Sequence, residues 1–191
     1  NHDWYHLNGN WNEWQRLEWK FRIPKGFQPT TKFCHLHQLK AQEGNNGAPL
    51  ITISTRCDKD GGNKRVQVIH TGDTRTSGKG VIIDNLPLAD FEDEWIQVET
   101  EMHYTHHGTF RIKLTRISDG KVLADQSFAD VDLWRKGATS IRNKFGIYRS
   151  LGRKMQSASD RPDNGLKDES LQLADFKVYE AHTNPNPQPH D

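Results

Sequence analysis

Hydrophobic and polar side chains alternate along most of this chain with the period of two that defines a β-strand. In residues 14–24 (WQRLEWKFRIP), for example, Leu17, Trp19 and Phe21 are separated by charged residues. Because successive side chains of a strand point to opposite faces, this pattern predicts a strand with one buried face. A convincing amphipathic helix is missing from the sequence, although residues 130–138 are compatible with one or two helical turns.

The same alternation recurs along the chain between clear turn signals. It is found in residues 14–24, 32–41, 49–56, 64–70, 94–104, 109–116, 143–150 and 171–181. Asp119-Gly120 lies between two such stretches and predicts a hairpin. Many short strands at hairpin spacing indicate an all-β fold, an antiparallel jelly-roll sandwich with a concave groove on one face. We expect one domain over residues 1–181 and a tail rich in Pro and Asn over residues 182–191.

Length and charge limit the classes of function. With 191 residues the chain is long enough for one domain, and its longest apolar runs are strand-sized, so no membrane span is predicted. The formal net charge is only +1, yet residues 133–159 hold seven Lys or Arg and no Asp or Glu. Such a stretch forms either a solvated basic face or the binding surface for an anionic ligand.

The segment SIRNKFGIYRSLGRK, residues 140–154, carries the most unusual strand pattern. Alternation places Arg142, Lys144 and Tyr148 on one face and Phe145 and Ile147 on the other. A strand with two cations and a phenol on one face is typical of a basic exposed strand or of a ligand-binding one.

A second unusual strand contains the segment HLHQ. Alternation predicts that His35 and His37 share a face, with their imidazoles roughly 6.5–7 Å apart. Two such histidines are compatible with exposed surface residues, with half of a zinc site, or with residues that act in a substrate groove. A zinc site needs further ligands close by, and His103, His106 and His107 belong to a distant hairpin.

Together these two strands resemble the polysaccharide lyases of the β-jelly-roll superfamily, which includes alginate lyases, glucuronan lyases and heparin lyase I. The alginate lyases carry a Gln-Ile-His strand and a strand similar to YFKAGVYNQ; residues 35–37 and 144–148 occupy the matching places. Lys144 and Tyr148 also reproduce the Lys-x-x-x-Tyr spacing of heparin lyase I. The sequence departs from the alginate-lyase pattern in two places. His35 stands where those enzymes have the Gln, and the nearest counterpart of their early Arg-x-Glu-Leu-Arg strand is RLEWK, which contains Arg16.

The resemblance implies a lyase that cleaves a uronic-acid-containing polysaccharide by β-elimination, without an organic cofactor. It implies Tyr148 as the acid and His37 as the base or charge neutraliser. The substrate-binding residues that we expect are Lys144, His35, Gln38, Arg142 and Arg16. It further implies an anionic polysaccharide as partner and a secreted or periplasmic monomer that binds neither membrane nor nucleic acid. The start at Asn1 fits a mature secreted product or a trimmed chain.

Several alternatives stay open. The main one is a non-catalytic, lectin-like carbohydrate-binding module on the same fold, since fold does not settle function. A glycoside hydrolase needs a carboxylate pair facing one groove, for which Glu99 and Glu101 are the candidates. A nucleic-acid binder ranks last, because the strand pattern fits no oligonucleotide-binding barrel.

Two further features have two interpretations each. Asp58 and Asp60 in the segment DKDGGN form either a calcium loop or, as we prefer, a tight turn. Cys34 and Cys57 permit one disulfide but are equally compatible with free thiols in the core.

Overall fold

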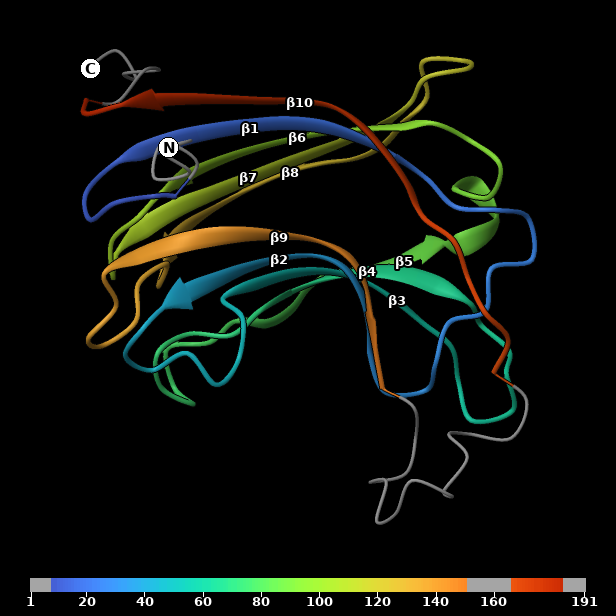
Figure 1. Ribbon diagram of the computed structural model, residues 1–191, viewed down its shortest axis with the longest axis horizontal. Coiled ribbons are helices and arrows are strands. Elements are labelled where there is room, and N and C mark those ends of the chain that lie inside the picture. The colour runs from blue at the N-terminus through green and yellow to red at the C-terminus, as the bar shows by residue number, and fades with distance from the viewer. Residues whose placement is uncertain (1–7, 151–165, 184–191) are drawn as a thin grey trace, which may run out of the picture.

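The computed structural model describes residues 8–150 and 166–183, which form two five-stranded antiparallel sheets packed face to face (Figure 1). One sheet has the strand order β10-β1-β6-β7-β8 and the other the order β5-β4-β3-β2-β9. The strands are β1 (Trp14–Arg22), β2 (Cys34–Gln42), β3 (Ile51–Arg56), β4 (Arg65–His70), β5 (Gly80–Pro87), β6 (Ile96–His103), β7 (Gly108–Arg116), β8 (Val122–Val131), β9 (Ser140–Arg149) and β10 (Gln172–Ala181). The predicted antiparallel sandwich is confirmed.

The core lies between the two sheets and follows the alternation in the sequence. On β1, Leu17, Trp19 and Phe21 are almost completely buried, whereas the charged residues between them face outward. Burial of each large apolar side chain stabilises the fold by about 1.5–3 kcal/mol. The inward-facing residues of β1 therefore contribute substantially to the packing of the two sheets. The predicted hairpin at Asp119-Gly120 joins β7 to β8, and Gly120 has a φ of 71°.

Both sheets arch in the same sense in Figure 1, so the outer face of the β5-β4-β3-β2-β9 sheet is concave. We call this surface the concave face. Strands β2 and β9 lie side by side and bend together toward their common end, where Cys34 pairs with Arg149. The side chains that point outward from these two strands therefore share one curved surface.

The segment predicted to contain one or two helical turns, residues 130–138, is not helical. Its first residues end β8, and the rest forms an irregular connection to β9 in which Arg135 donates hydrogen bonds to the carbonyls of Pro49 and Thr71. The helical element in the described ranges is the 3-10 helix η2 (Leu88–Asp90). Nothing helical in those ranges has the length and hydrophobicity to cross a membrane. The tail predicted over 182–191 lies outside the described residues beyond Thr183.

Candidate active site

A β-bulge in β2 separates the two histidines of the HLHQ segment. His35 pairs with Ser54 of β3 but His37 pairs with the next residue, Ile53, so β2 contains one extra residue between them. A bulge of this kind shifts the alternation by one position. The prediction that His35 and His37 lie on one face of the strand is therefore wrong.

His37 points into the core between the sheets. Its side chain is 2% exposed, stacks on Phe145 at 4.8 Å between ring centroids, and contacts the indole of Trp19 from the opposite sheet at 5.3 Å. Its Nε2 donates a hydrogen bond to Oδ1 of Asn143 at 2.9 Å. Burial lowers the pKa of His37 to about 4. The expectation that this imidazole faces the groove beside Tyr148 is wrong, because the bulge turns it inward.

His35 takes the place on the concave face that was expected for His37. It is half-buried, and it lies directly opposite Tyr148 across the β2–β9 ladder, with the ring centroids 6.1 Å apart. Phe33 stacks on the imidazole at 4.8 Å between ring centroids and also contacts the ring of Tyr148 at 5.4 Å, so the three rings form one cluster. The structure thus brings together one histidine and one tyrosine on an exposed face, as the sequence predicted, but with a different histidine.

The hydrogen bonds of His35 define which ring nitrogen carries the proton. Nδ1 lies 2.6 Å from Oγ of Ser54, and that hydroxyl donates its proton to Oγ1 of Thr52 at 3.1 Å. Because a serine hydroxyl has a single proton, Nδ1 of His35 must be the donor to Ser54. Burial and the cation of Arg56 lower the pKa of His35 to about 4, so the ring is neutral near pH 7. Its Nε2 then carries a lone pair that can accept a proton.

Tyr148 is held on the concave face by a second irregularity, in β9. Between the pairs His35–Tyr148 and His37–Phe145, β9 advances by one residue more than β2, and Gly146 within this stretch has a φ of 127°. Few residues other than glycine adopt such a backbone conformation. The phenol is 59% exposed, so it is available to a ligand.

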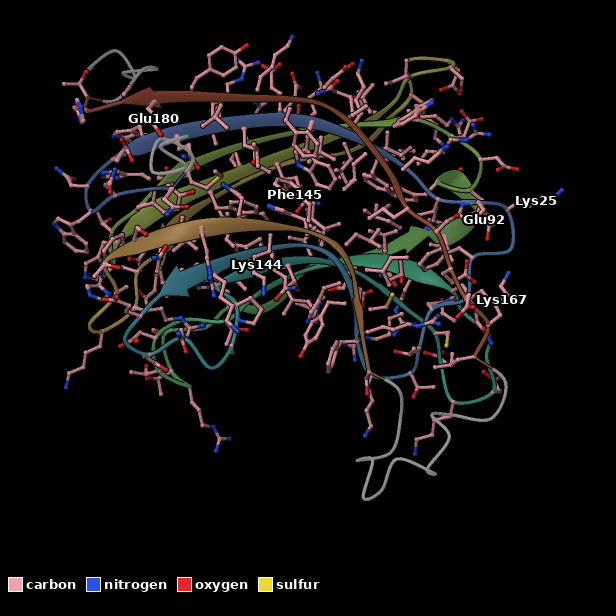
Figure 2. The ribbon with its side chains drawn as sticks, in the orientation of Figure 1. Lys25, Glu92, Lys144, Phe145, Lys167 and Glu180 are labelled. Carbon is pink, nitrogen blue, oxygen red and sulfur yellow. The ribbon has the colours of Figure 1, made fainter. Side chains whose placement is uncertain are left out.

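The cations of β9 and β2 gather on the same face. Lys144 pairs with Gln38, and Arg142 pairs with Lys40, across the β2–β9 ladder. Partial burial lowers the pKa of Lys40, and the cations of Lys144 and Arg142 lower it further. Figure 2 shows Lys144 on the opposite side of β9 from Phe145, which lies between the sheets. The predicted placement of Arg142, Lys144 and Tyr148 on one face, opposite Phe145 and Ile147, is confirmed.

Arg16 is far from this surface, contrary to expectation. It lies on β1 in the other sheet and points outward, where it forms ion pairs with Glu18 at 2.6 Å and Glu99 at 3.4 Å. The alternation correctly predicted an outward-facing arginine, but it could not tell which sheet the strand would join. Glu101, the other hydrolase candidate, is likewise on that sheet and pairs with Arg111 at 3.5 Å.

The remaining candidates have structural explanations. Asp58 accepts hydrogen bonds from Arg65 at 2.9 Å and Asn63 at 3.2 Å, and Asp60 accepts one from the backbone N–H of Gly62 at 2.9 Å, as expected for a tight turn. Across the described residues, no group of three or more His, Cys, Asp or Glu side chains could hold a metal ion. Cys34 and Cys57 are buried free thiols.

Two outward-facing polar residues of β3, Ser54 and Arg56, belong to the site but were missed in the sequence. Ser54 continues a row that runs across four strands from Tyr148 and His35 to Gln67 of β4. Arg56 lies two residues farther along the same strand. The signal was present, because Ile51 and Ile53 face the core and the residues at even positions must then face outward.

Comparisons with known proteins agree with this architecture. No protein-family model and no curated protein matches the chain. Among solved structures it is similar to an alginate lyase from Pseudomonas aeruginosa, with 17% identity, a TM-score of 0.51, and coverage of 91% of this chain and 68% of that one. It is also similar to the family 7 alginate lyase A1-II′, with 10% identity, a TM-score of 0.55, and coverage of 94% and 66%. The fold is that of the β-jelly-roll alginate lyases.

The chain spans about two thirds of the length of these two solved alginate lyases. Identity this low shows the shared fold, so the chemistry must be argued from the side chains of this chain. The concave face presents a neutral imidazole, an exposed phenol and a group of cations, and these are the residues on which a functional assignment depends.

Proposed function

We propose that this protein is a polysaccharide lyase that cleaves a uronic-acid-containing polymer by β-elimination and leaves an unsaturated uronate end. The observation that supports this proposal most is that His35 and Tyr148 are direct cross-strand partners on the concave face. A further support is the similarity to A1-II′, whose substrate complex was obtained with a variant carrying a histidine and a tyrosine replacement.

The two side chains suit the two proton transfers of the reaction. In β-elimination a base removes the proton on the carbon beside the carboxylate, the electron pair of that C–H bond forms a carbon–carbon double bond, and the bond to the leaving oxygen breaks. His35, with Nδ1 committed to Ser54, offers Nε2 as the base. Tyr148 has a phenolic proton to give to the leaving oxygen. This assignment transfers to His35 the role first expected for His37.

The charge of the surrounding face suits a polymer with one carboxylate on each uronate unit. Lys40, Arg142 and Lys144 form a group of cations close enough for the latter two to lower the pKa of Lys40. In the described part of the chain none of these three forms a salt bridge, so an anionic sugar chain meets cations that are not already neutralised. Gln38 lies among them and can donate its amide N–H groups to a sugar or carboxylate.

A large anionic polymer does not cross membranes, so the proposal carries with it action outside the cytoplasm. We therefore keep the expectation of a secreted or periplasmic enzyme. A single copy of the concave face holds both proposed reacting groups, so we also expect a monomer.

The test is the ultraviolet absorbance of the unsaturated product during incubation with alginate, glucuronan and heparin. We expect a rise with at least one polymer, and a decrease in rate of roughly 10²–10⁴-fold for Tyr148→Phe, the range typical of losing a general acid. Tyr179→Phe is the matched control, because Tyr179 is 50% exposed but lies on β10 in the other sheet. Binding of a polymer without any product would refute the proposal and indicate a carbohydrate-binding module instead.

A further inference from the structure

Arg56 is placed to act on His35 from the neighbouring strand. It is the last residue of β3, two positions beyond Ser54, and Ser54 is the direct cross-strand partner of His35. Diagonal neighbours of this kind on one face of an antiparallel pair are about 7–8 Å apart. An arginine side chain can span this distance, so its guanidinium can share a ligand with the imidazole.

The charge of Arg56 is only partly offset within the described part of the chain, because burial and the Arg65 cation lower its pKa and the Asp84 carboxylate acts against them. Its cross-strand partner on β4 is Arg65, another cation. Arg65 is neutralised by Asp58 at 2.9 Å and Asp84 at 3.2 Å, but Arg56 forms no ion pair in the described ranges. Its Nε is buried without a hydrogen-bond partner. Like charges opposite one another destabilise a sheet, and a buried donor without an acceptor is costly, so this site favours an anion.

We propose that Arg56 binds the carboxylate of the sugar that loses its proton, and that the bound anion makes His35 a stronger base. The identification of the anion as a uronate rests on the lyase function proposed above. The coupling between an anion at Arg56 and the imidazole of His35 does not depend on that function.

The electrostatics of the free protein support this coupling. Burial and the Arg56 cation together lower the pKa of His35, which keeps the ring neutral but makes it a weak base. The other groups facing the ring are Ser54 of β3, Tyr148 of β9 and the phenyl ring of Phe33, and Arg56 is the charged group that lowers the pKa of His35. A carboxylate on Arg56 would offset the one cation that acts on His35, so its pKa would rise.

The rise should be measurable. At about 7 Å and an effective dielectric constant of about 20, offsetting one unit charge changes the pKa of a neighbouring group by roughly one unit or more. The base would therefore approach the pH at which the enzyme operates only when a uronate is bound. A neutral sugar in the same place would leave His35 a weak base.

Nitrogen-15 NMR of the histidine rings tests this directly, with His35→Gln used to identify the His35 signals among the ten histidines. We expect saturating sodium glucuronate to raise the pKa of His35 by about one unit or more relative to glucose at matched ionic strength. In Arg56→Gln the pKa should start higher and should not respond to glucuronate. Arg111→Gln, which changes an arginine on β7 of the other sheet, should behave as the wild type.

The results separate the two proposals. An unchanged His35 pKa in glucuronate, or an equal rise in Arg56→Gln, overturns the role of Arg56 even if the protein forms unsaturated product. A rise that depends on Arg56, in a protein that forms no product from any polymer, supports the anion site and refutes the lyase function. A rise that depends on Arg56 together with a large decrease in turnover for Arg56→Gln supports both.

Discussion

The imidazole of His35 and the phenol of Tyr148 face each other across the β2–β9 ladder, with ring centroids 6.1 Å apart. The next histidine along β2, His37, is separated from this pair by a bulge and is buried between the sheets. Two histidines that are nearly adjacent in sequence therefore have different environments, one catalytic in our proposal and one structural.

Substituting the two histidines should separate activity from stability. His35→Asn should reduce the rate of product formation by roughly 10²–10⁴-fold and cost less stability than the substitution of His37, because His35 is only half-buried. His37→Ala should decrease the free energy of unfolding by about 2–4 kcal/mol, because it leaves a cavity between Trp19 and Phe145 and removes the donor to Asn143. Turnover per folded molecule should persist in His37→Ala; a stable but inactive His37→Ala variant would contradict this division of roles.

Stability should decrease on acidification because of His37. Burial lowers its pKa to about 4, compared with 6.5 for an ordinary histidine. Between these values the unfolded chain binds more protons than the folded one, so the free energy of unfolding decreases as the pH falls from about 6.5 through 4. One pKa unit corresponds to about 1.4 kcal/mol, so His37 accounts for up to about 3 kcal/mol.

Urea unfolding at a series of pH values measures this effect. His37→Leu should flatten the profile in the acidic range, although His35, whose pKa is lowered in the same direction, contributes a remaining slope. The control is His182→Gln, since His182 is exposed near the end of the described residues. Identical profiles for wild type and His37→Leu would show that the buried imidazole is not the source of the acid sensitivity.

Lys144 should contribute to substrate affinity and not to the proton transfers. It lies on the concave face next to Gln38, but four residues from Tyr148 along a strand. We expect Lys144→Ala to raise KM by roughly three- to thirty-fold, with a smaller change in kcat, as for the loss of one charge-assisted hydrogen bond. The KM of the variant should depend less on salt. Lys177→Ala, on β10 of the other sheet, should leave KM unchanged.

Gly146 should be required for the conformation of β9. A side chain added there meets no atom within 4 Å, but its φ of 127° is one that other residues rarely adopt. Gly146→Ala should therefore cost about 1–3 kcal/mol of stability, and it should also reduce turnover because the irregularity positions Tyr148. Gly47→Ala is the control, since Gly47 has equal space and an ordinary φ. Full activity and stability in Gly146→Ala would refute this role.

Local pattern was enough to predict much of the fold and part of the site. The inward row of Leu17, Trp19 and Phe21 is visible in the sequence, because strand periodicity and hydrophobicity are both local properties. Tyr148 and Lys144 were also correctly placed on one face, since they are four residues apart and the irregularity at Gly146 leaves Phe145 and Ile147 packed against the core.

Pairing between strands decided the rest. Whether His35 or His37 lies on the concave face depends on the bulge in β2. A bulge is defined by the pairing with the neighbouring strand, and it changes which face the residues after it point to. Arg16 has the right local pattern, yet its strand hydrogen-bonds into the opposite sheet. Arg56 comes beside His35 only through the alignment of β2 with β3. These choices follow from contacts between segments far apart in the chain, which no local pattern records.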